Sequence, residues 1–155
     1  MKKFLFDCGT RDPLASTGLL VLRAGFGLMM LFGHGLPKLK NYDAMLKQWD
    51  VVPAVWPLSY MSYPMSLIMA IAAELVASGL LVLGLMTRPA AFMLGFAMCV
   101  AAFQVHGADP FFSKGGPAKE MAVLYLLPAF VLIVTGGGLW SLDAAIATDK
   151  RKRRR

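Results

Sequence analysis

The sequence predicts an all-α membrane protein that forms a bundle of four transmembrane helices. Of the 155 residues, 57% are apolar and 16% are charged, whereas about 25% of a soluble domain is charged. Four long apolar stretches follow one another, separated by segments that contain Pro, Gly and charged residues. One span takes about 20 residues, so four spans and their connections use nearly the whole length. We therefore expect a single transmembrane domain over residues 14–146.

Apolar runs and helix-breaking residues set the expected limits of each span. The first run contains Arg23 and is too long for the apolar region of a cleaved signal peptide, so we expect a retained helix that ends before Pro37. Three glycines from Gly136 onward loosen the end of the fourth helix, and Ser141 is expected to cap a short surface helix. The predicted spans are residues 14–36, 62–86, 89–106 and 120–140.

The segment between the first two spans is polar, aromatic and interrupted by proline. Pro53 and Pro57 exclude one continuous helix there. Trp49 and Trp56 are residue types that gather where a membrane meets water. We expect this segment to lie on the outer membrane surface.

Lys and Arg are distributed unevenly between the two membrane sides. With both termini inside, ten are cytoplasmic and five are outside, which predicts an N-in and C-in topology in a bacterial inner membrane. The segments 1–13 and 147–155 are then cytoplasmic. Much of the formal charge of +7 lies in the basic tail, which we interpret as an anchor at anionic lipid heads and not as a nucleic-acid site. The inner set is Lys2, Lys3, Arg11, Arg88 and residues 150–155, and the outer set is Lys38, Lys40, Lys47, Lys114 and Lys119.

Arg23 and Glu74 are ionisable residues within predicted spans. An ionisable group at mid-bilayer costs several kcal/mol unless it is paired or faces water, so each needs a partner. If both helices begin at the same depth, Arg23 lies about 13 Å and Glu74 about 18 Å from the inner end. We therefore expect an intramembrane ion pair between them, with either a packing role or a functional one.

Several polar side chains are expected at the outer helix ends. They would form a polar pocket beneath the two outer loops, although each is also of a type that water and lipid heads satisfy at an interface. Two imidazoles and a carboxylate suit a divalent metal, but no local ligand spacing supports one, so we expect no metal. A protonatable His beside an apolar cleft suits a quinone head group. The expected pocket residues are His34, Lys38, Gln104, His106 and Glu120.

The order of short motifs along residues 14–146 resembles the DoxX family of small bacterial four-helix membrane proteins. Each motif is weak alone, and their order and spacing together are more specific. The motifs are Leu22-Arg23, Gly33-His34-Gly35, Pro37-Lys38-Leu39, Ala73-Glu74-Leu75, Gly79-Leu80-Leu81, Leu83-Gly84-Leu85, Thr87-Arg88-Pro89-Ala90, Lys119-Glu120 and Trp140-Ser141-Leu142-Asp143.

The resemblance implies a four-helix inner-membrane protein, related in name to a subunit of a thiosulfate:quinone oxidoreductase. It implies a fold more strongly than a reaction, because most members have no established activity. Recurrent polar positions of the family correspond here to Arg23, Lys38, Glu74, Arg88, Glu120 and Asp143, of which Arg88 and Asp143 are expected to form a cytoplasmic polar anchor.

The leading functional hypothesis is a redox-associated subunit that binds a quinone or similar lipophile at its outer face. The sequence holds no haem, flavin or iron–sulfur motif, so a partner in a larger membrane redox complex would carry any redox centre. His34 or Glu120 would accept a proton from a bound quinol. The alternatives are a non-catalytic assembly or scaffold subunit and a small-solute transporter, which with four helices would require a homo-oligomer. The residues do not decide whether the chain is itself an enzyme.

Overall fold

Helices form the fold throughout the part of the chain that the structure describes. The computed structural model describes residues 9–152, with side chains up to Thr148, and this part contains no strand. Residues 1–8 of the predicted cytoplasmic segment and the side chains beyond Thr148 in the basic tail lie outside the described residues. The all-α prediction is confirmed for the described chain.

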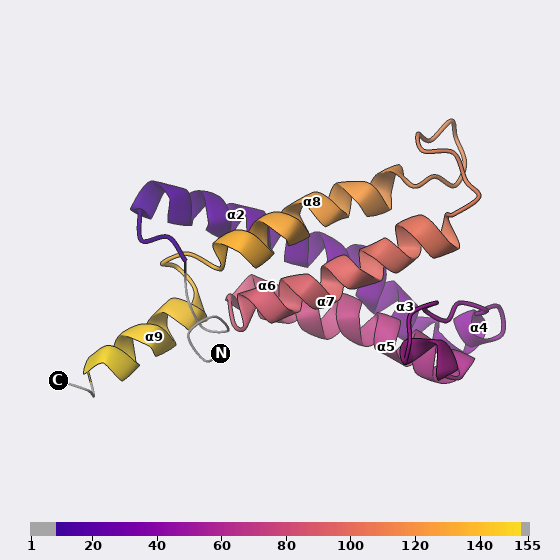
Figure 1. Ribbon diagram of the computed structural model, residues 1–155, viewed down its shortest axis with the longest axis horizontal. Coiled ribbons are helices and arrows are strands. Elements are labelled where there is room, and N and C mark those ends of the chain that lie inside the picture. Colours follow the sequence, from indigo (N-terminus) through magenta and orange to yellow (C-terminus); the bar gives the residue numbers. More distant parts are fainter. Residues whose placement is uncertain (1–8, 153–155) are drawn as a thin grey trace.

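Four long helices lie side by side as an antiparallel bundle (Figure 1). Three are long and apolar enough to cross a membrane, and the fourth is apolar but shorter. The first comprises α2 (Pro13–Met30), η1 (Leu31–Gly35) and α3 (Leu36–Lys40). The second comprises α5 (Tyr63–Ala72), η3 (Ala73–Ala77) and α6 (Ser78–Leu83), the third α7 (Thr87–Val100) and η4 (Ala101–Val105), and the fourth is α8 (Glu120–Thr135).

Shorter elements complete the two ends of the bundle. The connecting segment 41–62 contains α4 (Tyr42–Leu46) and η2 (Leu58–Tyr60), and it lies with the loop 106–119 at what we name the loop end. The helix α9 (Leu142–Lys152) lies at the opposite end, near the start of α2, which we name the terminal end (Figure 1). Ser141 Oγ accepts a hydrogen bond from Ala144 N at 3.2 Å, so the predicted capping of a short helix is confirmed.

The first, second and fourth helices end at residues other than those predicted. The second ends at Leu83 and not at residue 86, since Gly84 has a φ of +68°. The first continues past Pro37 to Lys40, because the π-turn η1 joins Leu36 N–H to Leu31 O. This wider turn relieves the clash that a proline ring makes with the preceding turn of a regular α-helix. The fourth ends at Thr135, five residues early, since Gly136 has a φ of +77° and leaves the helical conformation.

A buried polar junction joins the helices at the terminal end. Asp143 is 1% exposed, and its carboxylate accepts hydrogen bonds from Met86 N at 2.8 Å, Thr87 N at 2.9 Å and Thr87 Oγ1 at 2.9 Å. It therefore caps the start of α7, where backbone N–H groups lack helical acceptors. Arg88 Nη1 donates to Ile133 O on α8 at 3.2 Å. These contacts fix the third helix, which carries one wall of the site described next.

Candidate functional site

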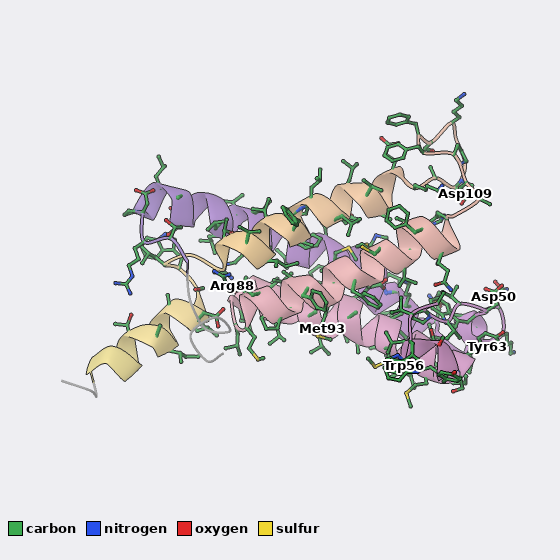
Figure 2. All side chains as sticks on the ribbon, in the orientation of Figure 1. Asp50, Trp56, Tyr63, Arg88, Met93 and Asp109 are labelled. Carbon is green, nitrogen blue, oxygen red and sulfur yellow. The ribbon has the colours of Figure 1, made fainter. Side chains whose placement is uncertain are left out.

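A cavity of about 450 Å³ lies in the loop half of the bundle. The first, second, third and fourth helices all contribute to its walls, and the connecting segment 41–62 contributes Trp49, Val51 and Pro53. Figure 2 shows Asp50 and Trp56 of this segment, with Tyr63 at the start of α5, gathered at the loop end. Most lining side chains are apolar, so the cavity is a hydrophobic pocket with a few polar groups, as small-molecule sites usually are.

Three π-helical turns contribute residues to this cavity. His34 comes from η1, Glu74 from η3, and Ala101 and Val105 from η4. A π-turn holds one residue more than an α-turn, and such turns occur frequently at functional sites. Gly35 permits the close approach of η1 to η3, because a Cβ there would lie 2.8 Å from Glu74 O. Two of the widened turns, η1 and η3, thus lie against each other beside the cavity, and η4 adds apolar lining from the third helix.

An ion pair between Lys38 and Glu74 forms one wall of the cavity. Lys38 Nζ donates to Glu74 Oε1, and both residues line the cavity. Glu74 is 3% exposed, whereas the Lys38 side chain is 22% exposed. The second carboxylate oxygen, Glu74 Oε2, is buried and accepts no hydrogen bond from any residue that the structure describes. The pair therefore has an unused acceptor.

The predicted ion pair between Arg23 and Glu74 is wrong. Arg23 is buried and its guanidinium donates to Leu81 O at 2.8 Å, Val82 O at 2.6 Å and Trp140 O at 2.6 Å. Two of these carbonyls belong to the last turn of α6, where the helix dipole is negative. Neutral backbone carbonyls thus bind both terminal nitrogens of the guanidinium, whereas Arg23 Nε is buried without a hydrogen-bond partner among the described residues.

The error came from assuming that the first two helices begin at the same depth. The first helix extends beyond α6 toward α9, so Arg23 is level with the end of the second helix (Figure 1). Glu74 lies eight positions from Val82 along that helix, or about 12 Å. Lys38, near the other end of the first helix, is the basic residue level with Glu74.

The two histidines of the predicted pocket both line the cavity. The His34 ring meets the Tyr125 ring edge to face, with centroids 5.7 Å apart, and Tyr125 also lines the cavity. His106 Nδ1 lies 2.8 Å from Asp109 Oδ2. Both imidazoles are therefore oriented by a neighbouring side chain. Within residues 9–152 no group of three or more His, Cys, Asp or Glu is arranged to hold a metal ion.

Gln104 and Glu120 were predicted in the pocket but do not line the cavity. Gln104 instead attaches the connecting segment to the third helix, because its Oε1 accepts from Ala54 N at 3.1 Å and its Nε2 donates to Val52 O. Glu120 Oε2 accepts from Ser113 N at 3.2 Å, within the loop that precedes α8. Gln104 therefore holds the connecting segment 41–62 in place as the roof of the cavity at the loop end. Glu120 accepts a hydrogen bond within the neighbouring loop 106–119.

Sequence reasoning did not assign Trp49, Ser66 or Tyr125 to the pocket, although all three line it. Ser66 Oγ donates to Val51 O at 2.5 Å and accepts from Trp49 Nε1 at 3.4 Å, which fastens the roof to α5. Trp49 carried a signal as an interfacial aromatic residue. Ser66 and Tyr125 lie within apolar runs and carried none.

The cavity reaches the lipid-facing surface of the bundle. Met69, Phe92 and Met93 line it and are also exposed, with Phe92 62% exposed. Figure 2 shows Met93 on the outer side of α7. From Phe92 to Val105 the lining extends over 13 positions of the third helix, or about 20 Å. The cavity is thus elongated, with polar groups toward the loop end and an apolar portion open toward lipid.

These contacts predict two outcomes for double-mutant cycles. Lys38→Met leaves the buried Glu74 carboxylate without its cation, and Glu74→Gln removes the charge that pairs with Lys38. Together the two substitutions should therefore lower the free energy of unfolding by at least about 1 kcal/mol less than the sum of the single effects. Arg23→Met and Glu74→Gln should be additive within about 0.5 kcal/mol, because the residues share no partner. Unfolding in mixed SDS micelles measures both cycles. Coupling in the second cycle and additivity in the first would contradict the contacts described above.

Comparison with known proteins identifies the family. The sequence model of the DoxX family matches residues 18–107, more than half of the chain. An uncharacterized protein of Haemophilus influenzae is 27% identical over 140 residues, which cover 90% of each chain. A second uncharacterized protein of that organism is 39% identical over 82 residues, covering 52% of this chain and 60% of the other. No solved structure matches.

The matched region contains the first helix from residue 18 onward, the whole second and third helices, and both residues of the Lys38–Glu74 pair. The motifs at Lys119-Glu120 and Trp140-Ser141-Leu142-Asp143 lie beyond it. The apolar helices and the family match together indicate a multi-pass membrane protein in contact with the lipid bilayer. The chain belongs to the DoxX family.

Proposed function

We propose that this protein is a redox-associated membrane subunit that holds a quinone or a similar tailed lipophile in the cavity at its loop end. The observation that carries the proposal is an apolar cavity of about 450 Å³ whose wall contains the buried Glu74 carboxylate paired with the partly exposed Lys38. Sites for small molecules usually enclose about 300–1,000 Å³ and combine apolar walls with a few fixed polar groups. The cavity has this size and composition.

The distribution of side chains along the cavity supports an amphipathic occupant. Lys38, Glu74 and His34 supply hydrogen-bonding groups for a polar head. The exposed Phe92 and Met93 leave room for an apolar tail to extend into the surrounding lipid. A lipophile that diffuses in the bilayer could enter from this side without crossing water. A quinone, with its polar ring and isoprenoid tail, has this division.

We propose that a partner protein, and not this chain, carries out electron transfer. This chain would supply the binding cavity and a proton acceptor, and a second protein in a larger membrane complex would supply the redox centre. Glu74 replaces Glu120 as the candidate acceptor, because Glu74 lines the cavity and Glu120 does not. A carboxylate in the wall of a cavity, within reach of a bound ligand, is suited to proton exchange.

We further propose that the terminal end faces the cytoplasm and the loop end the outside of a bacterial inner membrane. The sequence count of ten Lys and Arg in the segments predicted inside against five in the segments predicted outside supports this orientation. The head of the bound lipophile would then lie near the outer interface.

Binding is tested by the fluorescence of Trp49, which lines the cavity. The variant Trp56→Phe/Trp140→Phe retains Trp49 alone, and in lipid nanodiscs a decyl-tailed benzoquinone should quench its emission saturably. The matched variant Trp49→Phe/Trp140→Phe retains Trp56, which is 78% exposed and does not line the cavity, and should show only weak, linear quenching. Equal, linear quenching of both variants would show partition into lipid without a site.

Orientation is tested with single cysteines in a Cys8→Ser/Cys99→Ser background. In intact cells, a membrane-impermeant maleimide should label Lys114→Cys in the exposed loop 106–119. It should leave Ala145→Cys, exposed on α9, unlabelled until the cells are opened. Labelling of Ala145→Cys in intact cells, with Lys114→Cys protected, would reverse the proposed topology.

A further inference from the structure

The unsatisfied carboxylate oxygen of Glu74 favours a ligand that can donate a hydrogen bond to it. Glu74 is 97% buried, and Oε2 lacks a hydrogen-bond donor among residues 9–152. Leaving a buried charged acceptor unsatisfied costs more than a neutral hydrogen bond contributes. A ligand that donates a hydrogen to Oε2 removes this cost, whereas a ligand that offers only lone pairs does not.

Lys38 can donate a hydrogen bond to a ligand atom that lies beside Glu74. Its Nζ donates to Glu74 Oε1, and an ammonium carries three donors. Because Lys38 also lines the cavity and is partly exposed, a further N–H is available to an atom next to the pair. A single ligand oxygen beside the pair therefore meets a cationic donor and an anionic acceptor.

A hydroxyl group matches this arrangement and a carbonyl does not. A hydroxyl can donate its hydrogen to Glu74 Oε2 while its oxygen accepts from Lys38 Nζ. A carbonyl oxygen accepts from Lys38 but turns its lone pairs toward the carboxylate. Sites that bind a hydroxyl through buried polar groups reject analogues that lack it, because those groups are then left unpaired.

We infer that Glu74 and Lys38 make the cavity selective for a lipophile whose head carries a hydroxyl, a hydroquinone or phenol, over the corresponding quinone or ether. The inference rests on the proposed function, since it specifies the ligand of the same cavity. The inference concerns ligand binding and no chemical step. Glu74 is the residue that would determine the preference for a hydroxyl-bearing head.

The experiment uses two pairs of probes with the variant Trp56→Phe/Trp140→Phe in nanodiscs, which keeps Trp49 as its sole tryptophan and serves as the wild type at Lys38 and Glu74. The first pair is 4-decylphenol and 4-decylanisole, which are similar in shape, do not undergo quinone redox chemistry and differ in the hydroxyl hydrogen. The second is a decyl-tailed benzoquinone and its hydroquinone, measured without oxygen. One hydrogen bond to a charged group corresponds to roughly 10- to 100-fold in affinity. We expect the phenol and the hydroquinone to bind more tightly than their partners by that factor.

Glu74→Gln tests the residue directly. The amide can donate to a carbonyl, and Lys38 is released to do the same, so the preference should fall to at most about twofold or shift toward the quinone. Glu120→Gln is the matched control, because it makes the same change at a carboxylate outside the cavity and should retain the wild-type preference. If Glu74→Gln fails to fold, the phenol and anisole comparison in wild type still decides the question.

The outcomes separate this inference from the proposed function. If all four probes bind saturably and the two members of each pair have equal affinities, the inferred selectivity is overturned. Solvent would then supply the hydrogen bond to Glu74 Oε2. The binding site of the proposed function would remain. An unchanged preference in Glu74→Gln would assign it to another residue and also overturn the inference. If no probe binds saturably to wild type, the proposed function and the inference both fail.

Discussion

A charge inside a bilayer must be satisfied by the protein itself, and the two ends of this bundle meet that constraint differently. At the terminal end, three backbone carbonyls surround Arg23, two of them from the last turn of α6, so the cation is used in joining the first helix, the second helix and the chain before α9. Toward the loop end, Lys38 satisfies one oxygen of Glu74 and leaves the other without a donor from the described chain. The first arrangement joins three segments through backbone carbonyls, although Arg23 Nε has no partner among the described residues. The second leaves an unsatisfied oxygen on a residue that lines the cavity.

Three of the helices that line the cavity depart from regular α geometry: η1 packs against η3, and η4 lies nearer the loop end. The turns η1, η3 and η4 widen their helices where His34, Glu74 and Val105 line the space, and the second and third π-turns are formed from runs rich in small residues. The connecting segment then closes the space from the loop end through Gln104 and Ser66. Leu81, Leu94 and Leu132 are fully buried in the hydrophobic core that holds the helices together.

Hydropathy and motif order predicted much of the fold, because a bilayer requires long apolar helices and these are visible in composition. They also placed His34, Lys38 and His106 near one another, since helix ends on one membrane side must meet. They did not fix the relative depth of neighbouring helices, and for this reason Arg23 was paired with Glu74 when Lys38 is the partner. The π-turn that carries the first helix through Pro37 has no residue signature, and neither does the turn of the loop toward Glu120 that keeps its carboxylate out of the cavity. Such features depend on contacts between segments, which a single sequence does not display.

The central claim is that the head of a tailed lipophile sits beside Lys38 and Glu74. The most direct measurement is photolabelling in nanodiscs with a decyl-tailed phenol that carries a diazirine on its ring, followed by mass spectrometry of the peptides. The claim predicts saturable labelling of residues near His34, Glu74 and Val105, which come from three different helices and meet only at the cavity. An excess of unlabelled 4-decylphenol should suppress it. Labelling spread along the lipid-facing side of α8, or concentrated near Arg23 at the terminal end, would contradict the claim.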